Sequence, residues 1–597
     1  MADKTLERNE FAVLAAVLAA RTAPTQRQIA QVCGLSVGTV NSAIATLHDT
    51  GLLDAYTVTP AGIEALAPYR VNNAVILAAG LSTRFAPISY EKPKGMLKVR
   101  GEVLMERQIE QLHEAGIDDI TIVVGYMKEE FFYLADKYGA DIVVNPLYAQ
   151  RNNNYTLWLV RDRLANTFVC SSDNYFVENP FEPYVYDAYY AAEHTDEPTE
   201  EYLITVGPHD IITAMDTAGG PGGWCAVGHA YFDRAFSTRF IELLGEVVEK
   251  PKTYDLLWED VYARFVHELP MRIRRYAAGV LNEFDSLDDL RRFDPYFIDN
   301  VDSSILDNIE SVLGCTRDAI RDITPIKQGL TNMSFKFTCD GKPYVYRHPG
   351  AGTDEIISRI AETQAETVAK ELGLDGTFLH EDERTGWKLS HFIEGSASLD
   401  YHDDAQVKHA MKIARTLHRC GRAIEAAFDV YEKAEEIIAL LNERARASFS
   451  DFDELHASIE RVHGHLVHDG VAPCLCHNDF YDPNFLVTSD AMHLIDWEYA
   501  GMGDYASDLG TFICCSDYTY DEALRVISWY FDREPSDVEL AHCVGYVALS
   551  AFYWYVWAIY KDVCGDPVGE YLYIWYRYAK DYAKRALELR SSCSDEA

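Results

Sequence analysis

The chain has 597 residues, of which 48% are hydrophobic and 25% are charged. A length of this order predicts about four compact domains, and the composition excludes a disordered, collagen-like or disulfide-scaffold protein. The formal net charge is −41, from 53 Lys plus Arg against 94 Asp plus Glu. This excludes a general polyanion binder, because nucleic-acid affinity depends largely on Lys and Arg. Any phosphate site must therefore be local.

The cysteines and the apolar segments predict a cytoplasmic protein. The 13 cysteines are odd in number and scattered, without C-x-x-C spacing, as expected for reduced thiols. The N-terminal apolar run follows acidic residues and has no small-residue cleavage site, so we do not interpret it as a signal peptide. The most apolar late stretch, residues 545–560, is shorter than the ~20 residues that a membrane span needs. We expect a buried helix there and no membrane span.

Residues 1–71 are predicted to form a small helical module. Helices are expected over 10–20, 26–33 and 36–48, followed by a short hairpin and a closing helix. This order resembles the winged helix-turn-helix domains of bacterial regulators, which implies DNA binding through the third helix. That helix contains no Lys or Arg, so we favour a docking, dimerising or regulatory module over DNA binding. Homo-oligomers remain possible.

Residues 72–300 alternate between strands and helices. Buried strands are expected over 74–80, 120–126, 141–145 and 167–171, with a helix over 104–115 after the first of them. Strands separated by helices imply right-handed crossovers and a parallel-type sheet. The middle segment is therefore predicted to be an α/β, Rossmann-like domain.

The first of these strands runs into a glycine turn rich in polar and cationic residues. Gly80 is followed by Ser82, Thr83 and Arg84, and Lys94 comes after a short loop. Between positions 84 and 107 six cations stand against three acids, which inverts the global charge. Backbone N–H groups of a glycine turn approach phosphates closely, so this loop predicts a bound polyanion.

The string AVILAAGLSTRFAPISYEKPKGMLKV resembles the L-A-A-G-x-x-x-R…P-K loop of nucleotidyltransferases. Over most of residues 72–295 the order and spacing are similar to bacterial CTP:phosphocholine cytidylyltransferases. The resemblance implies that CTP binds at the loop, with Lys94 facing the reacting α-phosphate and Arg84 the departing pyrophosphate. It also implies that Asp173 and Asp285 hold Mg²⁺, which prefers carboxylate oxygen. A strand-end role for Asp173 and a helix N-cap for Asp285 stay open.

Four further residues are candidates for a pocket that holds a trimethylammonium group through cation–π contacts: Asn154, Tyr155, Trp224 and Trp258. Aromatic side chains in a protein of this size usually pack in the core. Both interpretations stay open for each of these residues.

Residues 301–597 begin with a helix and two strands, 334–339 and 344–347, which a hairpin turn at Asp340-Gly341 is predicted to join. The rest is mainly helical. The run His477-Asn478-Asp479, with Asn484 five residues later and Asp496 after a short strand, matches the catalytic loop of aminoglycoside and choline kinase-like phosphotransferases. The resemblance implies an α+β, protein-kinase-like fold that uses ATP. Asp479 fits the base near the acceptor hydroxyl, and Asn484 and Asp496 fit the Mg²⁺ ligands.

The nucleotide side of this domain is expected from two further segments. A loop with Thr331 and Asn332 would cover the phosphates, although it departs from a full glycine-rich loop. Arg347 stands where protein kinases place a Lys, and Glu362 would pair with it. This exchange resembles the choline kinase branch.

The alcohol site rests on aromatic residues. Trp554 and Trp557 are three apart on a predicted helix and therefore share a face, and Tyr481 lies near the catalytic loop. Together they would form a cage for choline, whose quaternary nitrogen cannot donate hydrogen bonds. Simple packing of a helical lobe is the alternative.

The two resemblances together predict a bifunctional enzyme. Choline and ATP would give phosphocholine, and phosphocholine and CTP would then give CDP-choline and pyrophosphate, with Mg²⁺ at both sites. Three alternatives stay open: the same chemistry on ethanolamine or another amino alcohol, a DNA-binding regulator whose enzyme-like domains sense metabolites, and one inactive domain that serves as a scaffold.

Overall fold

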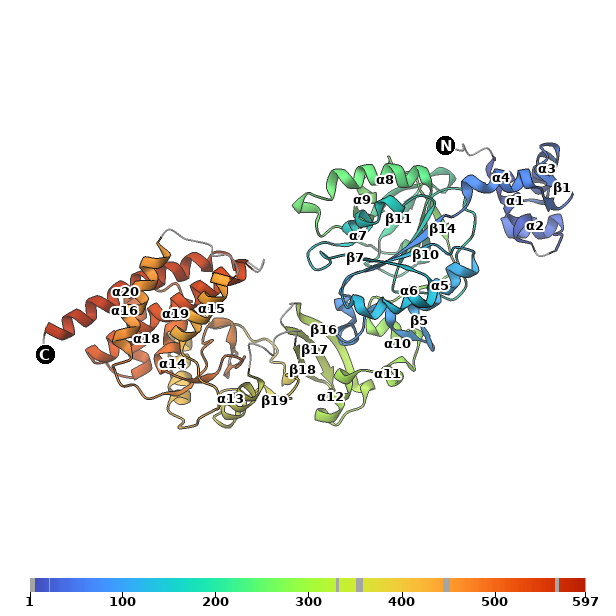
Figure 1. Ribbon diagram of the computed structural model, residues 1–597. Helices are drawn as coiled ribbons and strands as arrows, with labels where there is room; N and C mark the ends of the chain where they lie inside the picture. Colours follow the sequence, from blue (N-terminus) through green and yellow to red (C-terminus); the bar gives the residue numbers. More distant parts are fainter. Residues whose placement is uncertain are drawn as a thin grey trace. The chain divides into compact units, whose positions relative to one another are not determined.

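The computed structural model describes residues 6–20, 22–328, 332–349, 358–443, 451–563 and 568–595 (Figure 1). The chain separates into two compact units, Met1–Asp307 and Asn308–Ala597. The division falls inside helix α12 (Ser304–Leu313).

The first unit opens with the predicted small helical module. The caps explain why its helices begin where they do: Thr25 and Gln28 form a capping box at the start of α2, and Ser36 accepts a hydrogen bond from the Thr39 N–H at the start of α3. Gly34, with φ of +64°, makes the turn between these helices. The module consists of α1 (Arg8–Ala19), α2 (Gln26–Cys33), α3 (Val37–Asp49), β1 (Leu53–Asp54), β2 (Thr57–Val58) and α4 (Pro60–Leu66).

Aromatic and charged contacts join this module to the domain that follows. The hydroxyl groups of Tyr69 and Tyr186 donate to the Leu6 carbonyl oxygen at 3.2 and 3.0 Å. Arg8 Nη1 lies 2.7 Å from Asp187 Oδ2, and Asp187 also pairs with Arg272 at 2.9 Å. The contacts with Tyr186 and Asp187 come from Leu6 and Arg8, at the start of the module, and α3 takes no part in them.

The middle domain is built on a nine-stranded sheet with the order β12-β11-β13-β8-β3-β6-β7, to which β10 and β14 are added. The strands β3, β6, β7 and β8 pair in parallel, as the sequence predicts, but β13 pairs with its neighbours β8, β10 and β11 in the antiparallel direction. The four predicted strands thus form the parallel part of the sheet, and the strands of the antiparallel part were not predicted. Antiparallel neighbours need no crossover helix, and no α-helix lies between β8 and β13. The bounds are β3 (Asn73–Ala78), β6 (Ile120–Val124), β7 (Asp141–Val144), β8 (Thr167–Ser171), β10 (Tyr189–Thr195), β11 (Leu203–Val206), β12 (Ile212–Asp216), β13 (Gly223–Phe232) and β14 (Arg272–Arg275).

Helices cover both faces of this sheet and bury two hydrophobic cores (Figure 1). One core receives side chains from α7, α8 and α9, and the other from α5 and α6. The parallel strands β3 and β8 are neighbours, so their carboxyl ends meet at one edge, where ligands of such sheets bind. The helices are α5 (Leu104–Glu114), α6 (Tyr133–Tyr138), α7 (Asn153–Leu159), α8 (Arg234–Val247), α9 (Trp258–Arg264), α10 (Leu287–Phe293) and α11 (Phe297–Asn300).

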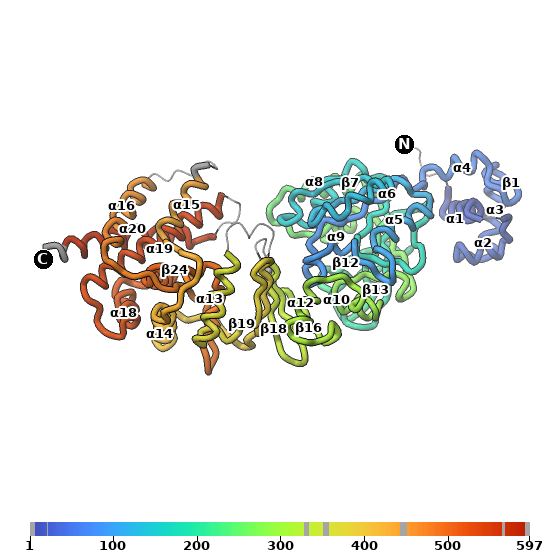
Figure 2. Tube along the Cα trace, turned by 60° about the horizontal axis from the view of Figure 1, so that its bottom comes forward, coloured from blue at the N-terminus to red at the C-terminus, as the bar shows by residue number. Residues whose placement is uncertain are grey.

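The second unit begins with an antiparallel sheet in the order β16-β17-β18-β20-β19, against which α13 packs through β19 (Figure 2). The predicted hairpin joins β17 to β18 through Asp340 and Gly341, both with positive φ, as a two-residue hairpin turn requires. The other three strands carry no comparable turn signal and were not predicted. The bounds are β16 (Ile320–Gln328), β17 (Asn332–Cys339), β18 (Lys342–Pro349), β19 (Phe378–Glu381), β20 (Lys388–His391) and α13 (Arg359–Glu371).

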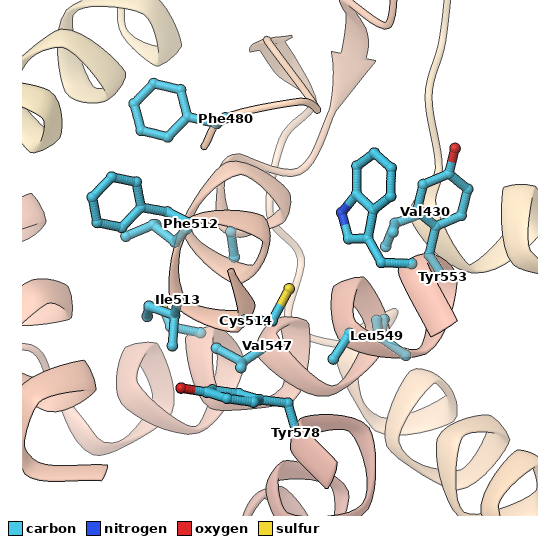
Figure 3. Close-up of a cluster of buried hydrophobic side chains, with 14 of the residues drawn as sticks. Val430, Phe480, Phe512, Ile513, Cys514, Val547, Leu549, Tyr553 and Tyr578 are labelled. Carbon is cyan, nitrogen blue, oxygen red and sulfur yellow. The ribbon is translucent and has the colours of Figure 1, made fainter. Parts of the chain in front are cut away.

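The remainder of this unit is mainly helical and is centred on α19. By length and composition alone α19 could span a membrane, as could the bent pair α2 and α3. However, 83% of the most apolar stretch of α19 is buried inside the protein. Figure 3 shows Val547 of α19 beside Cys514 of α17 and Tyr578 of α20, and Tyr553 of α19 beside Val430 of α15. The predicted buried helix is present. The helices are α14 (Asp404–His418), α15 (Val430–Glu443), α16 (Phe452–Leu466), α17 (Tyr505–Cys514), α18 (Tyr520–Phe531), α19 (Asp537–Val563) and α20 (Tyr571–Asp595), with short strands β21 (Cys474–Cys476), β22 (Phe485–Val487), β23 (Met492–Leu494) and β24 (Gly501–Gly503).

Helices α17 and α19 cross closely at Gly510, which generates a prediction for stability. A Cβ at Gly510 would lie 2.5 Å from the backbone oxygen of Tyr546, where the chain cannot yield cheaply. We expect Gly510→Ala to lower the free energy of unfolding by about 1–3 kcal/mol, measured by denaturant titration of the full chain. Gly464→Ala is the matched control: it lies in α16 with nothing within 4 Å, and we expect stabilisation of about 0.5–1 kcal/mol. Equal effects of the two changes would contradict the prediction.

Candidate active sites

The first unit contains a cavity of about 440 Å³ at the carboxyl ends of β3 and β8. Its wall is formed by the loop after β3, by the loop after β8 and by the segment that leads into α7. The predicted residues Gly80, Ser82, Arg84 and Asp173 line it. The cavity is mostly polar in its lining residues, which suits a ligand that carries phosphate.

The loop after β3 makes a sharp turn at Ser82 and continues as a short 3-10 helix. Ser82 adopts the left-handed conformation with φ of +50°, and a single 3-10 turn, Thr83–Phe85, follows it. The Phe85 ring is 1% exposed and anchors this turn, whereas the Arg84 side chain is 71% exposed. A buried ring next to an exposed guanidinium directs the charge toward the cavity that Arg84 lines.

Lys94 is the buried cation at the centre of the site. Its Nζ atom lies 2.8 Å from Asp173 Oδ2 and 3.9 Å from Asp285 Oδ1, and Arg84 pairs with Asp285 at 2.9 Å. Burial by itself lowers the pKa of Lys94, but the two carboxylates outweigh it and raise that pKa. The structure therefore brings together four residues that the sequence singled out in separate segments. Ser286 and not Asp285 caps α10.

Two further carboxylates in this site were missed by the sequence analysis. Burial, together with a hydrogen bond to Asp285 and the charge of that residue, raises the pKa of Glu201 to about 8. Burial and the charges of Asp173 and Asp285 raise the pKa of Glu283 well above its ordinary value. Glu283 stands two positions before Asp285, and this closeness in sequence could have identified it. Glu201 lies in a loop in which no local sequence pattern indicates a site.

None of the four residues predicted to bind the trimethylammonium group lines the 440 Å³ cavity. Asn154 is buried and donates to the Thr253 carbonyl oxygen at 2.7 Å. Tyr155 and Trp224 are half-buried beneath Arg151 and Arg275, with ring-to-cation distances of 4.6 and 5.1 Å. Trp258 is 3% exposed and stacks on Tyr190 at 5.4 Å in the core. Core packing is the role that the structure gives to Trp258.

The residue after Trp258 is ionisable and half-buried. Glu259 accepts hydrogen bonds from the Tyr190 hydroxyl at 3.2 Å and from Asn153 Nδ2 at 3.5 Å. Burial raises the pKa of Glu259 to about 7. Because Asn153 lines the cavity, this carboxylate lies directly behind its wall.

In the second unit, Asp479 and Asn484 are held against each other. Asn484 Nδ2 donates to the carbonyl oxygen of Asp479 at 2.8 Å and to its Oδ2 atom at 2.7 Å. Burial and the charge of Asp496 raise the pKa of Asp479 well above its ordinary value. The Asn484 amide oxygen and the half-exposed Asp496 carboxylate are the oxygen donors that a hard divalent cation requires.

Asp508 fixes the backbone of this catalytic loop and was not predicted. It is fully buried on α17 and accepts hydrogen bonds from the N–H groups of His477 and Asn478 at 2.9 and 2.6 Å and from His418 Nε2 at 2.9 Å. Asn478 adopts a left-handed φ of +65°. The sequence signal that could have identified Asp508 is that it is the one acid in an otherwise largely apolar helix.

The predicted pair between Arg347 and Glu362 is present, with 2.5 Å between Nη2 and Oε1. Arg347 also lies 3.2 Å from Glu381 and 3.5 Å from Asp496. Burial alone would raise the pKa of Glu362, but Arg347 and Lys388 outweigh it and lower that pKa to about 2. Thr331 lies outside the described residues, and of Asn332 only the backbone is described, where β17 begins.

The aromatic residues of α19 lie in one group. The rings of Trp554 and Trp557 are 5.5 Å apart, and Trp575 of α20, which was not predicted, lies 5.8 Å from Trp554. Trp554 is 7% exposed and its Nε1 donates to Thr511, so its polar atom is used within the core. Trp557 and Tyr481 are half-buried and remain accessible in part.

Three family models match the chain in the order that the fold shows. They are the MarR family over residues 4–60, the MobA-like NTP transferase domain over residues 74–194 and the phosphotransferase enzyme family over residues 322–538. The winged-helix, nucleotidyltransferase and kinase-like folds follow one another from the N-terminal to the C-terminal end.

Individual relatives cover one domain each. Choline-phosphate cytidylyltransferase of Streptococcus pneumoniae is 34% identical over 225 residues, which are 37% of this chain and 96% of that protein. 2-Aminoethylphosphonate cytidylyltransferase of Lancefieldella rimae is 30% identical over 38% of this chain and 93% of its own length. The crystal structure of choline kinase LicA from Streptococcus pneumoniae is 24% identical, with a TM-score of 0.40 over 48% of this chain and 98% of that one.

The middle domain thus matches a whole cytidylyltransferase in sequence and holds Lys94 and Asp285 against Asp173 and Arg84, which line the cavity. The last domain matches the phosphotransferase model across its catalytic loop. The chain belongs to the family of the pneumococcal choline-phosphate cytidylyltransferase, joined to a MarR-type winged helix and a phosphotransferase domain.

Proposed function

We propose that this chain makes CDP-choline from choline in two steps. The last domain would transfer the γ-phosphoryl group of ATP to the hydroxyl of choline, and the middle domain would transfer the cytidylyl group of CTP to the phosphocholine formed. The observation that carries the proposal is the presence of two separate charge constellations in one chain: Lys94 among Asp173 and Asp285, and Asp479 beside Asn484. The product of one reaction is the substrate of the other.

In the phosphoryl transfer, Asp479 would accept the hydroxyl proton of the alcohol as its oxygen attacks phosphorus. Asn484 holds the Asp479 carboxylate by the 2.7 Å hydrogen bond to Oδ2, which leaves Oδ1 to face the alcohol. Arg347 lies within 3.5 Å of Asp496 and would bring its charge to the nucleotide phosphates. Mg²⁺, when held by Asn484 and Asp496 in this domain and by Asp173 and Asp285 in the other, would neutralise phosphate charge.

In the cytidylyl transfer, a phosphate oxygen of phosphocholine would attack the α-phosphorus of CTP while the bond to pyrophosphate breaks. The attacking phosphate is already ionised, so the site needs cations more than a base. Lys94 supplies a fixed charge, because its two carboxylates hold it protonated. Arg84 is exposed and would exchange its ion pair with Asp285 for the departing pyrophosphate.

Buried acids near this site favour a substrate that carries a positive charge as well. Burial raises the pKa values of Glu201 to about 8 and of Glu259 to about 7. A cationic head group would stabilise their ionised forms, and the rings of Tyr190 and Tyr202 lie beside these carboxylates. A phosphorylated amino alcohol has this pairing of an anionic end with a cationic end.

Ethanolamine or an aminoethylphosphonate is the alternative substrate. The relative from Lancefieldella rimae carries the latter in its name, and carboxylates such as Glu259 also accept hydrogen bonds from a primary ammonium group. Competition between choline and ethanolamine in the first step, and between phosphocholine and 2-aminoethylphosphonate in the second, separates these possibilities.

A coupled assay tests the proposal directly. Purified chain with choline, ATP, CTP and Mg²⁺ is expected to give CDP-choline, identified by mass. Without ATP the reaction stops, and added phosphocholine restores it. Failure to consume either triphosphate would overturn the proposal.

Single changes are expected to separate the two half-reactions. Asp479→Ala should lower choline phosphorylation by about 10²–10⁴-fold and leave cytidylyl transfer from phosphocholine unchanged, and Asp173→Ala should do the reverse. The matched controls are Asp490→Ala and Asp216→Ala, which remove exposed acids of the same two domains. Product formation is followed by ³¹P NMR. Loss of both activities in either variant would contradict the assignment.

The pKa of Glu259 predicts a pH dependence for the second step. Because the pKa is raised to about 7, the ionised fraction rises between pH 6 and 8, and a cationic substrate should bind more tightly across that range. We expect KM for phosphocholine to fall as pH rises in the wild type and to change much less in Glu259→Gln, whose KM should be about tenfold higher at pH 8. Glu242→Gln, an exposed change on α8, is the control. The same pH profile in Glu259→Gln would refute this role.

A further inference from the structure

The face of the β16–β20 sheet that supports Arg347 carries a second buried cation. In the β18–β20 pairing Lys388 stands directly opposite Arg347, and in the β19–β20 pairing it stands opposite Glu381. Residues directly opposite on neighbouring strands have adjacent side chains. Glu381, Lys388 and Arg347 therefore form one row across three strands.

Helix α13 lies over this row and supplies two carboxylates to it. Lys388 Nζ donates to Glu366 and lies 3.8 Å from Glu362. Glu362 and Glu366 are four residues apart, so they share one face of α13. The side chains of both glutamates are 0% exposed and that of Lys388 is 12% exposed. The helix is thus attached to the sheet at two points, one turn apart.

The ion pair between Lys388 and Glu366 affects the ion pair between Arg347 and Glu362. Glu362 has one oxygen 2.5 Å from Arg347 and the other 3.1 Å from Arg359, so its position decides where the Arg347 guanidinium lies. Arg347 in turn reaches Asp496 at 3.5 Å. Ala361, Ala365 and Ala369 pack α13 into the core, and ion pairs at two successive turns oppose rotation of the helix about its axis more than one pair would.

We propose that Lys388 is a positioning residue for nucleotide binding in the phosphotransferase domain. By holding Glu366 it keeps α13 in the orientation in which Glu362 directs Arg347 toward Asp496. The inference rests on the phosphoryl-transfer half of the proposed function. It assigns to Lys388 an effect on ATP and none on the alcohol, whose predicted binding residues lie on other elements.

The test measures ATP binding to the full chain by calorimetry in the presence of Mg²⁺, together with KM for choline. We expect Lys388→Met to weaken ATP binding about tenfold and to change KM for choline less than twofold. Lys388→Arg should restore most of the affinity. Lys336→Met removes a lysine of the neighbouring strand β17 that pairs with the largely exposed Glu394, and it should bind ATP like the wild type.

A double-mutant cycle separates positioning from mere stability. Breaking a buried ion pair leaves an unpaired charge that destabilises the fold, so Glu366→Gln combined with Lys388→Met should recover thermal stability. If Lys388 acts through Glu366, ATP affinity should stay as low in the double variant as in either single variant. Recovery of affinity along with stability, or wild-type affinity in Lys388→Met, would overturn the inference. A wild-type chain that binds no ATP would overturn the phosphoryl-transfer proposal, and this inference with it.

Discussion

Both sites depend on a buried cation that is surrounded by carboxylates. With a net charge of −41, the chain repels phosphates over most of its surface, so nucleotide binding requires cations whose position is fixed. Lys94 and Arg347 meet this requirement in the same way, since each is buried and held by acidic side chains from more than one segment. Burying a charge is costly unless it is paired, and the pairs determine where each cation can lie.

The acids that hold these cations outnumber them, and the pKa values of the excess acids are raised as a result. In the first site Asp173, Asp285, Glu201 and Glu283 lie around Lys94, and burial raises the pKa values of the last two. In the second, burial and neighbouring acids raise the pKa of Glu381 to about 9 and that of Glu498 to about 7. A cation bound at either site would offset this excess of acidic groups, as the proposed magnesium nucleotides and cationic alcohol would do.

The sequence predicted those parts of the fold and of the sites that depend on local signals. The Asp340-Gly341 turn, the capping residues Thr25 and Ser36 and the His477–Asp479 run are visible within a few positions, and the structure contains the elements that they predict. The strands of the antiparallel half of the first sheet were not predicted, because their pairing is set by packing at long range. Glu201, Asp508 and Lys388 were missed for the same reason, since each gains its role only from residues far away in the chain.

Some of the strained backbone positions of the chain lie in the two sites. Ser82, Asn478 and Asp496 are non-glycine residues with φ between +50° and +69°, a conformation that persists only where the surroundings determine it. For Asn478 those surroundings are visible: Asp508 binds the N–H groups of two consecutive residues, and His418 completes the hydrogen bonding of that carboxylate. The catalytic loop is thereby held in one conformation before any ligand arrives. Asp508 thus fixes the backbone of the loop that carries Asp479, and its hydrogen bonds from the core offset the cost of the strained conformation at Asn478.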